Sequence, residues 1–149
     1  MNIKIKDPDL EFLEDGPWDE LYALTKRWST DIEFYRDDLW FLNQLIAKYM
    51  IWIIKSENLD LVNQMQRGLF ELNKKSKDLL EKLSKHSIRL GQLVENPNSR
   101  DAGVIKLEHE HLEEEIAEFV KSFRKNRKEV FKLTSYIINS EELASIMGS

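Results

Sequence analysis

The sequence has no cysteine and little glycine, proline or histidine, with five, three and three of these among 149 residues. The absence of cysteine excludes disulfides, thiol nucleophiles and metal sites built from thiolates. The shortage of glycine and proline, with 33% charged residues, is typical of a helical protein with few tight turns. A chain of this length normally folds around one core. We therefore expect a single helical-bundle domain over residues 1–149.

The formal net charge is −5. Nucleic acids and anionic membranes both favour proteins with a basic excess, so neither is expected as the main partner. The most apolar window, residues 39–54, contains Asn43, Gln44 and Lys48, whereas a membrane span needs about 20 mostly apolar residues. The N-terminal stretch lacks the apolar core of a secretory signal. We expect a cytoplasmic protein.

Apolar residues recur at steps of three and four along most of the chain, which is the spacing of one helix face. Three helices are predicted, at residues 17–55, 58–95 and 100–139. Pro17 suits the first turn of a helix, and the stretch 96–99 separates the second helix from the third. Residues 1–16 are expected to form an arm, and residues 141–147 a short tail helix.

The short connections require the three helices to run up, down and up as a coiled-coil-like antiparallel bundle, so the fold class is all-α. Paired residue numbers then sum to 114 or 115 between the first two helices and to 195 between the last two. The predicted layers include Trp28 with His86 and His109, Leu39 with Ser76 and Phe119, Leu42 with Leu72 and Phe123, and Ile46 with Leu69 and Asn126. Because three independent segments close in one register, this geometry is the main prediction.

Polar residues interrupt the predicted core at two places. Trp28, His86 and His109 share one layer, where we expect a buried, neutral, hydrogen-bonded histidine pair. Protonation of both rings near pH 6 would place like charges in that layer and loosen it. Asn126 occupies the second place, where a polar residue commonly sets the register or the oligomeric state.

An alternative reading is a metal-binding bundle with an oxidoreductase or storage role. Glu108 and His111 form one Glu-x-x-His unit of the kind found in di-iron bundles. A second unit is missing, because Leu83 stands three residues before His86. The candidate ligands of a smaller site are His86, His109, Glu108, His111 and Glu113. The main interpretation needs no cofactor.

A second alternative is weak nucleic-acid binding through a lysine stripe. The stripe consists of Lys121, Lys125, Lys128 and Lys132, at helical spacing. No aromatic platform is interleaved with it, and an acidic stretch at residues 113–118 directly precedes it. We therefore favour a solvated charged face.

The first helix carries large apolar residues outside its core face. They are Phe34, Trp40, Phe41, Ile51 and Ile54. A soluble monomer seldom exposes such a patch, so the arm, the tail or a second chain should cover it. The sequence has no nucleophile paired with a base, no phosphate-binding loop and no complete metal motif, so we do not expect an enzyme. The sequence predicts a non-enzymatic interaction or assembly module, as a homodimer through this face or bound to another helical protein.

Overall fold

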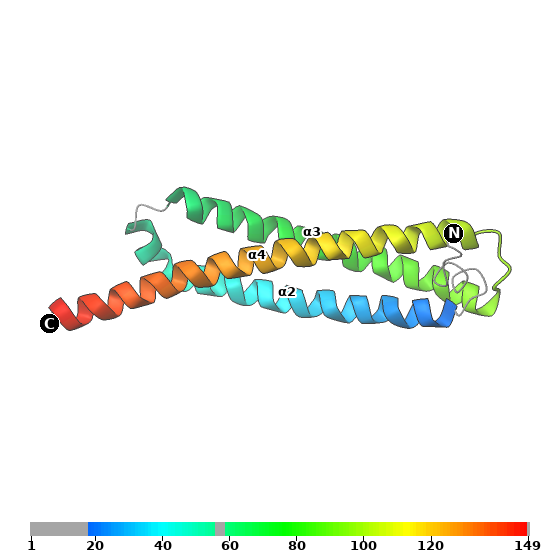
Figure 1. Cartoon of the computed structure of the whole chain (residues 1–149), viewed down its shortest axis with the longest axis horizontal. Coiled ribbons are helices and arrows are strands. Elements are labelled where there is room, and N and C mark those ends of the chain that lie inside the picture. Colours follow the sequence, from blue (N-terminus) through cyan, green and yellow to red (C-terminus); the bar gives the residue numbers. More distant parts are fainter. Residues whose placement is uncertain (1–17, 56–58, 149) are drawn as a thin grey trace, which may run out of the picture. The chain divides into compact units, whose positions relative to one another are not determined.

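The computed structural model describes residues 18–55 and 59–148, with side chains described for residues 18–49 and 59–139. It contains three α-helices that pack as a three-helix bundle (Figure 1). They are α2 (Trp18–Lys55), α3 (Leu59–Glu95) and α4 (Ala102–Gly148). Within these ranges no strand occurs, so the predicted all-α fold is confirmed. The predicted arm at residues 1–16 lies outside the described residues.

The bounds of α2 and α3 agree with the predicted helices to within a residue. A capping turn precedes α4, in which the Oγ of Ser99 accepts a hydrogen bond from the backbone N–H of Asp101 at 3.3 Å. The prediction of a separate tail helix at residues 141–147 requires a correction, since α4 continues through this stretch to Gly148. The reason is that residues 139–147 contain neither proline nor glycine to stop the helix.

The chain divides into two compact units, and each contains one segment of every helix. Unit 1 comprises residues up to Glu33 together with Lys77–Ala117. Unit 2 comprises Phe34–Ser76 together with residues from Glu118 onward. No described helix is apolar over a long enough stretch to cross a membrane.

Apolar side chains from all three helices fill the core of unit 1. One cluster consists of Trp18, Leu21, Leu90, Leu93 and Ile105, with Tyr22 and Ala102 packed against it. Ile32, Leu83 and Leu112, one from each helix, are also buried. Trp18 extends this core to the first residue of α2, a position that the heptad spacing did not identify.

The core of unit 2 contains a cluster of three aromatic side chains. The ring of Tyr35 lies 5.9 Å from that of Phe119 and 4.7 Å from that of Phe123. Ser76 is fully buried, and its Oγ donates a hydrogen bond of 2.7 Å to the backbone carbonyl of Asn73. The hydroxyl of this small core residue is therefore satisfied within its own helix.

The antiparallel register of α3 and α4 is visible in each unit. In unit 1, Nε2 of His86 lies 2.9 Å from Nδ1 of His109, and the two residue numbers have the predicted sum. In unit 2, the side chain of Asn126 occupies the space beside Gly68, so closely that an added Cβ would overlap its Nδ2 atom. Gly68 is one residue away from the predicted partner, Leu69.

Candidate functional site

The predicted histidine layer is present in unit 1 and is larger than expected. His86 is fully buried and His109 is 5% exposed. Nδ1 of His86 lies 2.6 Å from Oε1 of Glu108, and the ring of Trp28 stacks on that of His109 with centroids 4.7 Å apart. Arg89 donates from Nε to Oε1 of Glu108 at 3.0 Å and from its terminal nitrogen to Oε2. A continuous hydrogen-bonded chain therefore joins Arg89, Glu108, His86 and His109.

This network determines which ring nitrogens carry protons. A carboxylate only accepts hydrogen bonds, so Nδ1 of His86 donates to Glu108. In the neutral ring, Nε2 of His86 then accepts from the N–H at Nδ1 of His109. Each neutral ring thus donates its single N–H, from His86 to Glu108 and from His109 to His86.

The electrostatic environment keeps both rings neutral. Burial, followed by the charge of a protonated His86, lowers the pKa of His109 to about 4. Burial also lowers the pKa of His86, although Glu108 opposes this shift. Burial alone raises the pKa of Glu108, but hydrogen bonds from Arg89 and His86 outweigh it, so this pKa lies below its ordinary value. At neutral pH the network contains a carboxylate, a guanidinium and two neutral imidazoles.

The metal-ligand candidates are only partly brought together. Glu108, His86 and His109 are neighbours, whereas the side chain of His111 is 73% exposed and lies 3.4 Å from Glu115. Glu113 is also exposed. Among the described residues, no group of three or more histidine, aspartate or glutamate side chains is arranged to hold a metal ion. Arg89 further disfavours a cation beside Glu108, because its positive charge already neutralises this carboxylate.

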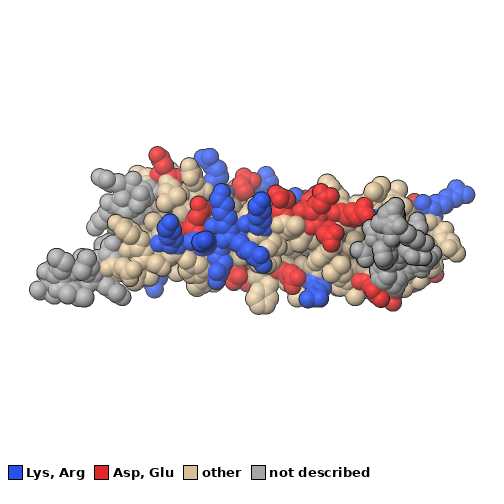
Figure 2. All heavy atoms as spheres, in the orientation of Figure 1, with Lys and Arg blue, Asp and Glu red and all other residues tan. Residues whose placement is uncertain are grey.

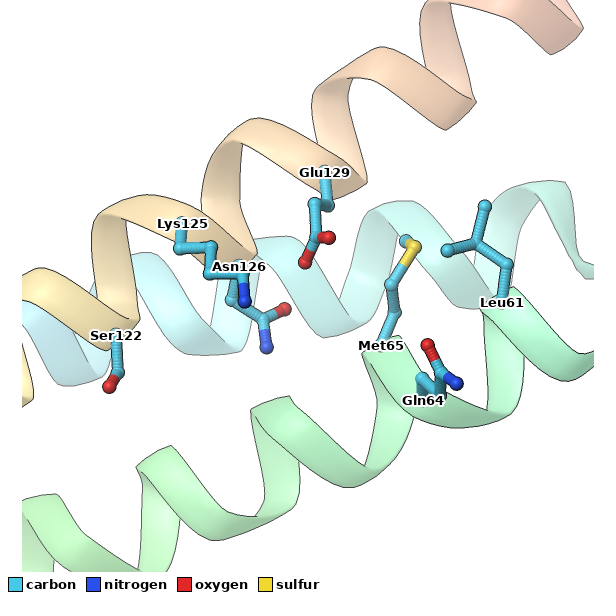
Figure 3. Close-up of a pocket in the computed structure, with 7 residues that line it drawn as sticks. All are labelled: Leu61, Gln64, Met65, Ser122, Lys125, Asn126 and Glu129. Atoms are coloured by element: carbon cyan, nitrogen blue, oxygen red, sulfur yellow. The ribbon is translucent and has the colours of Figure 1, made fainter.

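The second polar residue predicted in the core, Asn126 in unit 2, borders a pocket of about 290 Å³ (Figure 3). Figure 3 shows the side chain of Asn126 reaching from α4 toward α3. Its buried Oδ1 has no hydrogen-bond partner among the described residues. The remaining lining residues are Leu61, Gln64, Met65, Ser122, Lys125 and Glu129. Asn126 fits here because Gly68 offers it space.

The predicted interaction surface on α2 is exposed where its side chains are described. Phe34 is 70%, Trp40 65% and Phe41 48% exposed. Ile51 and Ile54 lie outside the residues whose side chains are described. Phe34 and Phe41 are seven residues apart and share one side of α2, whereas Trp40 projects about 100° away from Phe41 around the helix.

Part of this surface continues onto α4 within unit 2. The ring of Phe41 lies 6.4 Å from that of Phe131, and the guanidinium of Arg127 lies 4.7 Å from the Phe131 ring centroid. Phe131 was not among the predicted surface residues, because its position shows neither the core spacing nor a motif. We call Phe34, Phe41 and Phe131 the aromatic surface.

The lysine stripe is also exposed along α4 in unit 2. Figure 2 shows blue side chains gathered over this part of α4, and red ones over the part of α4 that belongs to unit 1. Lys82 and Glu115 form a 3.0 Å ion pair between α3 and α4 in unit 1.

The sequence reading overlooked Arg89 as a member of the histidine layer. The signal was present, since Arg89 follows His86 by three residues and so lies on the same side of α3.

The fold and its surfaces define the class as a three-helix-bundle protein with an exposed aromatic surface. No protein-family model, curated protein or solved structure matches the chain.

Proposed function

We propose that this chain is a non-enzymatic, cytoplasmic interaction module that self-associates through the outer face of α2. The observation that carries the proposal is the exposure of Phe34 and Phe41, at 70% and 48%, on one side of α2, with Trp40 exposed further around the same helix. Aromatic side chains are enriched in protein interfaces, and their burial supplies much of the binding energy. The histidine layer supports a structural role for the core, because its two imidazoles are buried and hydrogen-bonded.

A second copy of the chain is the partner that this surface fits best. The aromatic surface has an exposed acidic residue, Asp37, on its α2 side, and arginines on its α4 side, at Arg124 and Arg127. A two-fold contact places each edge against the opposite edge of the partner, so attractive pairs form at both ends. The apolar rings then lie at the centre of the contact, where they lose the most water.

The test is the mass of the full chain in solution, measured by sedimentation equilibrium. Phe34→Glu combined with Phe41→Glu should weaken association about 100-fold, because both rings belong to the aromatic surface and the change places charges inside an apolar contact. Ile88→Glu is the matched control, since Ile88 is 63% exposed on α3 in unit 1 and should tolerate the charge. Unchanged association in the α2 variant, with helix content preserved, would refute the proposal.

A further inference from the structure

The pocket beside Asn126 carries both signs of charge. Within unit 2 it occupies about 290 Å³ between α3 and α4, and Figure 3 shows the carboxylate of Glu129 pointing from α4 toward α3. Lys125 lines the same pocket one helical turn earlier on α4 and brings an ammonium group. Ser122 and Gln64 add a hydroxyl and an amide. One anion, one cation and neutral hydrogen-bonding groups together suit a ligand that carries both charges itself.

The side chain of Asn126 leaves an acceptor unsatisfied at this pocket. Its Oδ1 is buried and has no hydrogen-bond partner among the described residues, whereas buried oxygens of folded proteins nearly always have one. The terminal torsion of asparagine is soft, so a rotation of the amide turns Oδ1 toward the pocket. The pocket has the volume of roughly ten waters at ~30 Å³ each. It therefore has room for a molecule larger than water that brings the missing donor.

A more apolar pocket adjoins this one within unit 2. It has a volume of about 300 Å³ and is lined by Leu61, Leu133 and Tyr136 together with Glu129 and Lys132. Leu61 and Glu129 belong to both pockets, so the two are neighbours between α3 and α4. Leu133 and Tyr136 follow Glu129 by one and two helical turns. Along α4 the order is therefore a cation, an anion and then an apolar pocket.

We propose that unit 2 binds a free α-amino acid with a large apolar side chain in these two adjoining pockets. The carboxylate of the ligand pairs with Lys125 and accepts a hydrogen bond from the hydroxyl of Ser122. Its ammonium group donates to the carboxylate of Glu129 and to Oδ1 of Asn126. Each charge of the ligand thus meets an opposite charge, and the unsatisfied acceptor gains its donor.

The side chain of the ligand completes the fit. It passes over Leu61 and is buried against Leu133 and Tyr136, which provides the apolar contribution to binding. Ligands with a single charge fit less well, because an alkylamine would meet the like charge of Lys125 and a fatty acid that of Glu129. An internal residue of a peptide has neither charge on its backbone. Only a free amino acid combines both charges with an apolar side chain on one carbon.

The inference goes beyond the proposed function and does not rest on it. Both pockets are lined by residues of α3 and α4 and include no member of the aromatic surface. Binding of an amino acid also leaves the number of associated chains unchanged. The mass measurement that tests self-association is therefore not affected by this site.

The experiment is a titration of the isotope-labelled full chain with L-leucine, followed by NMR. The side-chain amide signals of Gln64 and Asn126 should shift together, with a dissociation constant of about 1 mM because the ligand has few atoms to bury. Three analogues test the parts of the ligand separately. L-Leucinamide lacks the carboxylate, N-acetyl-L-leucine lacks the ammonium group and glycine lacks the side chain, and each should bind at least about tenfold more weakly.

Substitutions test the two charges of the pocket. Lys125→Gln and Glu129→Gln should each weaken the binding of L-leucine about tenfold. Lys128→Gln is the matched control, because Lys128 is exposed on the same helix and lines neither pocket. Circular dichroism should show the same helix content in all three variants. An equal loss of affinity in the control would mean that L-leucine responds to the general charge of α4 and would overturn the proposed site.

Two other outcomes would also overturn the proposal. The first is the absence of any shift at about 20 mM L-leucine, which would saturate a site of about 1 mM and would show that the pocket holds water only. The second is equal binding of L-leucine and L-leucinamide, which would identify a site for amines. The chain with Phe34→Glu and Phe41→Glu should bind L-leucine with unchanged affinity, so this inference and the proposed function fail independently.

Discussion

The two units accommodate polar core residues in opposite ways. In unit 1, His86 and His109 belong to a chain of hydrogen bonds that ends in the Arg89–Glu108 ion pair. In unit 2, Asn126 stands alone, its Oδ1 unsatisfied among the described residues, in a space that Gly68 leaves open. A polar residue is tolerated in a helical core when partners satisfy it or when a small neighbour makes room for it.

The largest expected effect comes from breaking the network of unit 1. His86→Ala removes a fully buried ring and leaves Glu108 and His109 without their shared partner, so it should lower the free energy of unfolding by about 3 to 4 kcal/mol. Urea denaturation measures this loss. His111→Ala is the control, because its side chain is 73% exposed and its removal should cost less than about 0.5 kcal/mol. Equal losses in the two variants would contradict the role of the layer.

In unit 2 the corresponding experiment is a double-mutant cycle. Gly68→Ala alone should destabilise the protein by about 1 kcal/mol, because the new methyl group displaces Asn126. In an Asn126→Ala background the same change should stabilise it by about 0.5 to 1 kcal/mol, the helix-propensity gain of alanine over glycine.

Gly103→Ala is the matched control for this cycle, since its added methyl group has no described neighbour within 4 Å and should act alike in both backgrounds. The free energy of unfolding of the four chains provides the measurement. A change at Gly68 with the same sign in both backgrounds would show that Asn126 and Gly68 are not coupled.

The last comparison uses pH, which should act on unit 1 and not on the Asn126 site. His109 has a folded pKa of about 4 and an ordinary value of 6.5, so the unfolded chain binds the proton more tightly. Its stabilising contribution is complete above pH 6.5 and is lost as the pH falls toward 4. The shift of His86 has the same direction, whereas the contribution of Glu108 is lost only below about pH 4.5.

Unfolding free energies measured at about pH 7.5 and pH 5.5 should therefore differ by about 1 kcal/mol or more. His109→Gln removes one of the two titrating rings, so this difference should fall by roughly half. His111→Ala should leave the difference unchanged, because that ring is exposed. The same unfolding free energy at both pH values would show that the layer is not kept neutral by burial.

Most of the fold was predictable because heptad spacing repeats in three segments without a break. The layer of Trp28, His86 and His109 followed from that spacing alone, and the ring contacts confirm it. The predicted partner of Asn126 was Leu69, whereas in the structure Asn126 lies beside Gly68, one residue earlier. Heptad spacing does not show that a neighbouring glycine leaves room for a side chain. The continuation of α4 past residue 139 was missed for a different reason, since the apolar pattern weakens there although no residue stops the helix.

The surface was less predictable than the core. Exposure of Phe34, Trp40 and Phe41 followed from their positions on the helix, and the structure agrees. The contribution of Phe131 depends on a contact between α2 and α4, which no local pattern records. The same is true of the pocket that Leu61, Leu133 and Tyr136 line in unit 2, because its walls come from α3 and α4.

The sequence by itself determined the number of helices, the direction in which they run and the residues that face the core. Local periodicity and short connections suffice for these features, because each depends only on neighbours along the chain. Only the tertiary structure decided how each polar core residue is accommodated. Hydrogen-bond partners such as Arg89 and Glu108, and space such as that beside Gly68, come from distances between helices that periodicity does not specify.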